Sequence, residues 1–398
     1  MKPVKLILSF IFLIPIQAMA YAPFSYDPNH PFLSNEFQVQ MDEISNSQIS
    51  TANHWEMLVD AKPSLKKRIE MIQNARKMIL LSTFLFHNHF DPLSQSIAEL
   101  LIEKHKQGVE VYIIMDYSMS YIDPVLFKRL EMSGIHLTYF NPILSNDPYP
   151  FGVFWHEKLV ITDHMQAVLG GQNLYDEDYP YIPFDLLKWT DTDLYVEGPV
   201  VLDISNHFLE TWESLTGEKI EYGDRSLRDL SPEKNFPKNK CRFVYNKAHT
   251  GDKYLTQAYL HYIENATHSI IWQGNNLFLN ETFTQALIQA QQRGVEVILM
   301  TNSFVTSWWQ AFWYFYHAFF GNRPFKNTGV EVRLYTEKFN HSKIFYADGV
   351  VTSIGSANHD IYSLENDTES TLISYDRNFN ASVHEKLMYD LKTTVSAF

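Results

Sequence analysis

The chain has 398 residues, which is too long for one small domain and is enough for two or three. Its formal net charge of −14 disfavours a general attraction to nucleic acid or anionic lipid, so any phosphate binding must be local. The single cysteine, Cys241, excludes disulfides within the chain and gives little support to cysteine-based metal sites or thiol catalysis.

The N-terminus has the features of a secretory signal peptide. Two lysines precede an apolar run from Leu6 to Ile16, and Ala18-Met19-Ala20 fits the small-residue cleavage pattern. We therefore expect cleavage after residue 20 and export to the periplasm, to a membrane surface or to the medium. An uncleaved membrane anchor is the alternative, although the apolar run is shorter than the ~20 residues that span a bilayer.

The next segments predict an α/β sheet. Residues 21–60 are polar and contain three prolines, so we expect an extended N-terminal arm there. Helical spacing of apolar residues begins at Ser64, a plausible N-cap. The apolar runs 78–86 and 109–115 are typical of buried strands, with a second helix between them. This alternation indicates a sheet that is covered by helices on both faces.

Two sequence features recur at nearly the same offset. "HKQGVEVYIIM" at 105–115 is echoed by "QQRGVEVILM" at 291–300, and "HEKLVITD" at 156–163 is echoed by "HSKIFYAD" at 341–348. The offsets, about 186 and 185 residues, indicate an internal duplication. We predict two similar lobes, each a mixed sheet flanked by helices, over residues 61–215 and 241–398, joined by a linker over 216–240.

Each copy of the second feature is a cluster of histidine, lysine and aspartate followed by a glycine turn. The clusters are His156/Lys158/Asp163 and His341/Lys343/Asp348, and the turns are Gly170-Gly171-Gln172-Asn173 and Gly355-Ser356-Ala357-Asn358. Because side chains alternate along a strand, His156 and Lys158 share one face and Glu157 lies opposite.

These residue types suit the cleavage of a phosphodiester. The lysines neutralise the anionic oxygens, while Asn173, Asn358 and Ser356 add hydrogen bonds. Two histidines allow a two-step path, in which one attacks phosphorus and the other protonates the leaving alkoxide and then deprotonates the acceptor. No metal or cofactor is expected. A purely structural duplication would preserve apolar positions and not this polar set, so the repetition favours catalysis.

The pattern His-x-Lys-x4-Asp-x6-Gly-[Gly/Ser]-x-Asn, present twice, resembles that of the phospholipase D superfamily. "WTDTDLYVEGPVV" at 189–201 and "SLENDTES" at 363–370 are similar to segments that follow the motifs in bacterial cardiolipin synthases. The resemblance implies two α/β lobes with one active site between them. It also implies a role for each motif residue: His156 as nucleophile, His341 as general acid and base, Lys158, Lys343, Asn173, Asn358, Gly171 and Ser356 as substrate-binding residues, Asp191 and Glu369 as acceptors that orient the histidines, and Asp163 and Asp348 as supports of the motif loops.

Three residues around the first histidine depart from the family pattern. Glu157 stands where relatives often carry a basic residue, and Phe154 and Trp155 stand where polar or basic residues are common. These departures leave the preferred lipid head group open, though not the chemistry.

The segment FVTSWWQAFWYFYHAFF at 304–320 has no charged residue. Its helical spacing places Trp308, Trp309, Phe312 and Trp313 on one face, which predicts an interfacial helix that contacts a membrane, because tryptophan favours the membrane–water boundary. A helix buried in the core is the alternative.

Taken together, these patterns favour a phospholipid phosphodiesterase or phosphatidyltransferase, with a phospholipid substrate and a membrane surface as partners. Transfer and hydrolysis share one intermediate, so the sequence leaves that choice open, as it does the oligomeric state. A nuclease of the same superfamily is a second hypothesis, weakened by the two motifs in one chain and by the acidity, so no nucleic acid is expected as partner. A non-catalytic membrane-binding protein is the third, weakened by the complete motifs.

Overall fold

A computed structural model describes residues 21–86, 92–120, 124–141, 152–175, 188–220, 239–307 and 320–398. Three of the expected features lie outside the described residues. They are the signal peptide over 1–20, most of the linker, and the aromatic residues Trp308, Trp309, Phe312 and Trp313.

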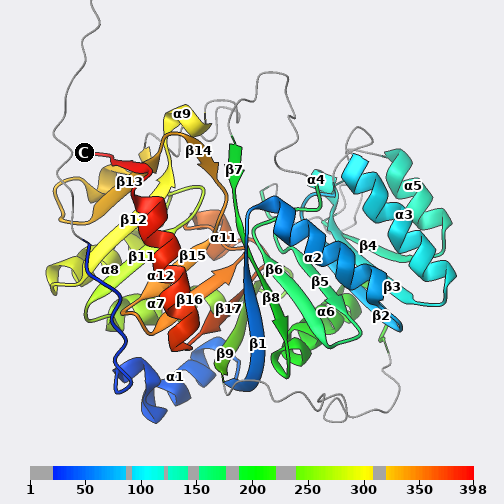
Figure 1. The fold of residues 1–398 in the computed structure, drawn as a ribbon, viewed down its shortest axis with the longest axis horizontal. Coiled ribbons are helices and arrows are strands. Elements are labelled where there is room, and N and C mark those ends of the chain that lie inside the picture. The colour runs from blue at the N-terminus through cyan, green and yellow to red at the C-terminus, as the bar shows by residue number, and fades with distance from the viewer. Residues whose placement is uncertain are drawn as a thin grey trace, which may run out of the picture.

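The first part of the chain builds one α/β lobe (Figure 1). Its strands are β1 (Ser50–Val59), β2 (Met78–Thr83), β3 (Glu110–Asp116), β4 (His136–Phe140), β5 (Leu159–Thr162), β6 (Gln166–Gly170), β7 (Lys188–Thr190) and β8 (Thr192–Glu197). Its helices are α2 (Ala61–Asn74), α3 (Pro92–Lys106), α4 (Tyr117–Ser120), α5 (Pro124–Met132) and α6 (Val200–Thr216).

The second part builds a lobe of the same kind. Its strands are β9 (Asn239–Lys247), β10 (Asp252–Lys253), β11 (Ser269–Gln273), β12 (Glu296–Asn302), β13 (Glu331–Tyr335), β14 (Lys338–Asn340), β15 (Ile344–Ala347), β16 (Val351–Gly355), β17 (Glu369–Ser374) and β18 (Thr394–Ser396). Its helices are α7 (Tyr254–Asn265), α8 (Glu281–Gln292), α9 (Phe304–Ser307), α11 (Ile361–Glu365) and α12 (Arg377–Leu391), with a 3-10 turn at Arg323–Phe325.

One continuous sheet crosses both lobes. From the junction outward, the first lobe has the order β1-β8-β6-β5-β2-β3-β4, and the second has the matching order β9-β17-β16-β15-β11-β12-β13, followed by β18. In each lobe three parallel strands adjoin a set of antiparallel ones, so both sheets are mixed. The predicted duplication, fold class and two-lobe architecture are therefore confirmed.

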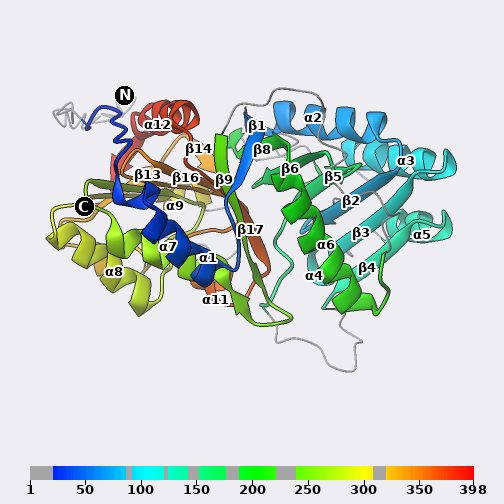
Figure 2. The same cartoon turned by 90° about the horizontal axis from the view of Figure 1, so that it is seen from below.

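Helices cover both faces of this sheet (Figure 2). In the first lobe α2 and α3 lie on one face and α6 on the other, and in the second lobe α7 and α8 lie opposite α12. Because both faces are covered, the parallel strands β2 and β3 are mostly apolar and are buried along most of their length. One apolar core extends across the lobe junction, where the ring of Trp55 on β1 meets that of Phe379 on α12 at 5.7 Å.

The expectation of an extended arm over residues 21–60 is wrong for most of that segment. Residues 31–59 form a 3-10 turn (Pro31–Leu33), helix α1 (Asn35–Ser45) and strand β1. Strand β1 pairs with β8 on one side and with β9 on the other, so it joins the two lobes. The turn and helix are held because Phe32 and Phe37 pack against Tyr262 of the second lobe.

Two smaller points concern helix boundaries and membranes. Helix α2 begins at Ala61, so Ser64 lies inside it as a buried residue and is not its N-cap. Within the described ranges, none of the helices combines the length and the apolar character that crossing a membrane requires.

Candidate active site

Backbone hydrogen bonds between the lobes hold the two motif histidines in place. The amide of His156 donates to the carbonyl of Thr368 at 3.0 Å, and the amide of His341 donates to that of Thr190 at 2.7 Å. Just before His341, β14 pairs in parallel with β7 of the first lobe. Each histidine therefore lies in a backbone segment that is hydrogen-bonded to the other lobe.

Each histidine is also oriented by a carboxylate of the other lobe. His156 Nδ1 lies 2.8 Å from Glu369 Oε1, and His341 Nδ1 lies 2.7 Å from Asp191 Oδ2. Each carboxylate accepts a hydrogen bond from the Nδ1–H group, which leaves Nε2 of each imidazole for the reaction. Asp191 and Glu369 therefore occupy the histidine-orienting positions expected from the sequence. The sequence did not predict that each carboxylate pairs with the histidine of the other lobe.

Burial controls the charge of these groups. It lowers the pKa of His156 to about 4, against the opposing effect of Glu369 and with the help of Lys158. Burial together with Lys343 and Lys158 lowers the pKa of His341 well below its usual value. Both imidazoles of the free enzyme are therefore neutral at neutral pH, as nucleophilic and basic catalysis require.

The two orienting carboxylates differ from each other. Burial raises the pKa of Asp191 to about 6. Burial would also raise that of Glu369, but His156, Lys158 and Ser356 together hold it below its ordinary value. His156 is thus paired with an ionised carboxylate near neutral pH, while the His341–Asp191 pair retains a proton below about pH 6.

The lysines of both motifs are buried beside the histidines. Lys158 and Lys343 are 1% and 2% exposed, and each ammonium donates to the backbone carbonyl of the histidine two residues earlier. A buried cation near two imidazoles provides the electrostatic attraction that an anionic phosphate needs.

The second residue of each glycine turn lies against an orienting carboxylate. A Cβ at Gly171 would come within 2.2 Å of Asp191 Oδ1, so only glycine leaves room for that carboxylate. At the matching position of the second motif, the hydroxyl of Ser356 donates to Glu369. The expected contact of Gly171 and Ser356 with the substrate stays a prediction.

The two asparagines that follow these turns are buried. Asn173 is 2% exposed, and its Oδ1 has no hydrogen-bond partner within the described ranges. Asn358 Oδ1 accepts a bond from the amide of Asn275 at 3.5 Å. Each asparagine also has an amide NH2 group, the kind of donor that binds a phosphate oxygen.

The motif aspartates support turns, and in the described part of the chain they make no hydrogen bond to the motif histidines. Asp163 accepts bonds from the amides of residues 76–78 at 2.8–3.0 Å, at the start of β2. Asp348 accepts equivalent bonds from the amides of residues 267–269, at the start of β11. Both have positive φ angles of 51° and 52°, which aspartate tolerates better than most residues.

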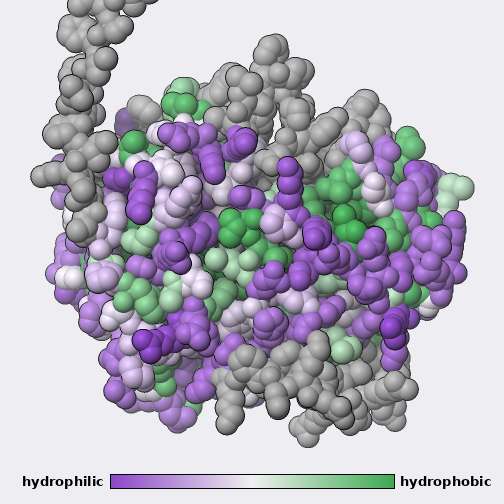
Figure 3. Space-filling view, in the orientation of Figure 1, coloured by the Kyte–Doolittle hydropathy of each residue, from purple (hydrophilic) through white to green (hydrophobic). Residues whose placement is uncertain are grey.

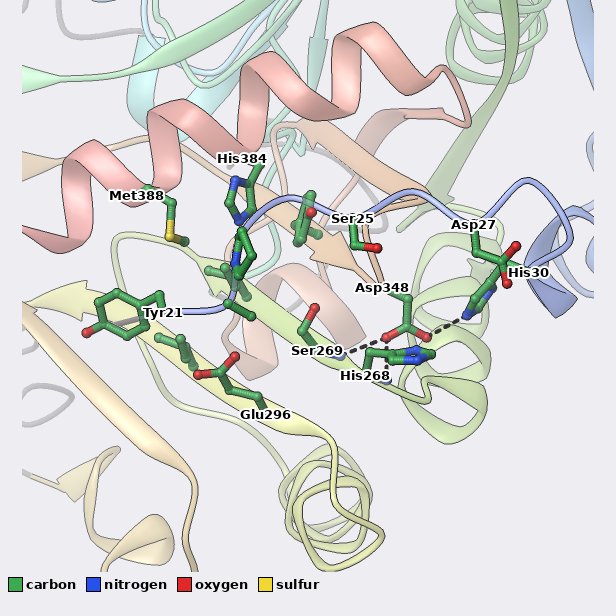
Figure 4. Close-up of a pocket in the computed structure, with 16 residues that line it drawn as sticks. Tyr21, Ser25, Asp27, His30, His268, Ser269, Glu296, Asp348, His384 and Met388 are labelled. Carbon is green, nitrogen blue, oxygen red and sulfur yellow. Dashed lines mark hydrogen bonds and ion pairs between the residues drawn. The ribbon is translucent and has the colours of Figure 1, made fainter. Parts of the chain in front are cut away.

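Asp348 has a further partner in the N-terminal segment (Figure 4). His30 Nε2 lies 3.0 Å from Asp348 Oδ2, and with His268 these groups are close enough together to hold a metal ion. However, His30 Nδ1 accepts a bond from the amide of Phe32, so in the neutral ring Nε2 carries the proton and donates it to Asp348. This hydrogen bond, with those from the His268 and Ser269 amides, holds the pKa of Asp348 below its usual value against the effect of burial.

Several residues around the site were missed by sequence reasoning. The ring of Phe84 packs edge-on against His156 at 4.7 Å, and that of Trp189 lies 5.5 Å from His341. Behind the first glycine turn, Arg68 and Asp193 form a buried ion pair at 2.8 Å, and Asp193 accepts the amide of Gln172. Trp189 and Asp193 flank Asp191 in the segment "WTDTD", which was the available signal.

Comparison with known proteins identifies the family of this chain. The sequence profile of the family described as "Cardiolipin synthase, PLD-like domain" matches residues 68–194 and 259–391, more than half of the chain. The chain belongs to this family. Both matched segments contain one motif histidine, so the family match follows the two lobes.

Individual relatives of the family span most of the chain. It is 27% identical over 355 residues to cardiolipin synthase A of Pseudomonas syringae, covering 88% of this chain and 71% of the relative. It is 26% identical over 358 residues to cardiolipin synthase of Clostridium perfringens, covering 87% and 72%.

Among solved structures, phosphatidylserine synthase of Haemophilus influenzae superimposes with a TM-score of 0.64. The match has 14% identity and covers 90% of this chain and 91% of that one, which shows the shared fold. The predictions of a phospholipase D-type enzyme and of the cardiolipin synthase resemblance are confirmed.

Proposed function

We propose that the protein transfers phosphatidyl groups between alcohols through a phosphohistidine, as a cardiolipin synthase-like enzyme. The observation that carries this proposal is the pair of crossed histidine–carboxylate contacts, 2.8 and 2.7 Å long, beside two buried lysines. The family match and the names of the relatives support a phospholipid as substrate.

His156 is the better candidate for the nucleophile. Its partner Glu369 has a lowered pKa and is ionised at neutral pH, so it increases the basicity of the His156 ring. Nε2 of His156 attacks phosphorus, the bond from phosphorus to the leaving alkoxide breaks, and the alkoxide takes a proton from His341.

His341 then reverses its role. His341 donates the proton that the His341–Asp191 pair holds below about pH 6. The negative charge of a bound substrate offsets the positive charges of the two lysines, so the proton is favoured on His341. In the second step His341 removes the proton of the acceptor hydroxyl, the acceptor oxygen attacks phosphorus, and the bond to His156 breaks. An alcohol as acceptor gives transfer, and water gives hydrolysis.

The proposal places the enzyme at a membrane surface outside the cytoplasm. The signal-peptide pattern of residues 1–20 supports export. Phe304 and Val305 of α9 are 53% and 56% exposed, and Figure 3 shows apolar atoms at the place that α9 occupies in Figure 1. These side chains are the first two of the uncharged segment 304–320 that we propose to contact lipid.

Incubation with phosphatidylglycerol vesicles tests this function. We expect the mature protein, from Tyr21 onward, to produce cardiolipin and glycerol, detected by mass spectrometry. His156→Ala and His341→Ala are each expected to reduce product formation by about 1,000-fold or more, because each removes one partner of a two-residue mechanism. Phosphatidic acid and glycerol as the sole products would show that the enzyme hydrolyses its substrate and does not transfer it. Variants as active as the wild type would contradict the assigned site.

A further inference from the structure

Glu157, between the catalytic His156 and Lys158, is completely buried. Its carboxylate Oε1 lies 2.8 Å from Nε2 of His207 on α6. The two side chains are 0% and 1% exposed. Burying a carboxylate costs free energy that an apolar residue of the same size would not, so packing alone does not account for glutamate here.

His207 connects this residue to the other lobe. Its ring centroid lies 4.4 Å from that of Tyr245 and 5.4 Å from that of Phe243, both on β9 of the second lobe. Glu157 and His207 both belong to the first lobe, so the first motif reaches the second lobe through the imidazole.

The second motif has a matching contact. Ser342, between His341 and Lys343, is also buried, and its hydroxyl lies 3.0 Å from that of Thr192 on β8. Ser342 belongs to the second lobe and Thr192 to the first. The middle residue of each motif is therefore linked to the opposite lobe by a polar contact. Ser342 makes this contact directly, and Glu157 makes it to His207, which packs against the other lobe.

We propose that Glu157 and His207 are positioning residues that hold the first motif in register with the second lobe. The function of His156 depends on Glu369 of that lobe, across a contact of 2.8 Å. A shift of about 1 Å between reacting groups can reduce a rate by about 100-fold. Glu157 is covalently linked to both His156 and Lys158 in the chain, so its contact with His207 fixes the positions of both neighbouring side chains.

Two variants separate this role from simple packing. The inference rests on the proposed function for the activity assay. Glu157→Gln keeps a hydrogen-bonding group of equal size, and kcat on phosphatidylglycerol vesicles is expected to stay within about threefold of the wild type. The double variant Glu157→Met/His207→Leu removes the pair without leaving a buried polar group unpaired, which protects stability. We expect it to fold with a similar Tm and KM but to lose about 10- to 100-fold in kcat.

A matched control and a second readout complete the test. Tyr262→Phe removes a buried hydrogen bond to Tyr375 in which no motif histidine, lysine or orienting carboxylate takes part, and it should lower Tm with kcat unchanged. The NMR signal of the His156 imidazole protons, which needs no substrate, is expected to move in the double variant and to stay in place in Glu157→Gln. Wild-type kcat in the double variant, or an unmoved His156 signal, would overturn the inference. If the wild type itself showed no turnover, the proposed function would be refuted, and the NMR result alone would test whether Glu157 positions His156.

Discussion

At the scale of single residues, the pKa values of the histidine pairs predict a bell-shaped pH profile. A pKa of about 4 for His156 places the acid limb of kcat/KM near pH 4, where the nucleophile becomes protonated, and the His341–Asp191 pair places the basic limb near pH 6. Glu369 raises the pKa of His156, so Glu369→Gln should move the acid limb to lower pH and reduce kcat about 100-fold. A pH series of initial rates measures both effects. An acid limb near the free-histidine value, or one that the substitution leaves in place, would contradict the assignment.

At the scale of elements, Asp163 joins the end of β5 to the start of β2 and has no contact with the reacting groups. Its carboxylate accepts three backbone amides, so Asp163→Ala removes these charge-assisted hydrogen bonds and should lower the free energy of unfolding by about 2–3 kcal/mol. The kcat of the folded enzyme should change less than threefold. Urea unfolding and active-site-normalised kinetics measure the two quantities, and a large loss of kcat at full stability would make Asp163 catalytic after all.

At the scale of the whole molecule, one complete site requires both lobes of one chain. His156 uses Glu369 and His341 uses Asp191, and the sheet that joins the lobes is continuous through β1 and β9. A mixture of the inactive His156→Ala and His341→Ala proteins is therefore expected to stay inactive at any ratio. Recovery of activity on mixing, measured with phosphatidylglycerol vesicles, would show that lobes exchange between chains.

The local chemistry of the site could be predicted from the sequence, but its long-range pairing could not. The spacing of His156 and Lys158 predicts that they share one face of an extended segment, which the structure places just before β5, and the repeat at 341–343 identifies the second half. Glu369 is 213 residues from His156, and no local pattern says which histidine it contacts. Strand β1 was missed for a related reason, because its partners β8 and β9 lie far away in the sequence and the preceding prolines suggested an irregular segment.

The continuous sheet also determines how products can leave. Opening the two lobes like a hinge would break the antiparallel pairing of β1 with β9 and separate both histidines from their carboxylates in the same motion. We therefore expect the lobes to stay closed through every turnover. A lipid product would then have to leave the site without any separation of the lobes, and its departure would depend on how readily its acyl chains return to the bilayer.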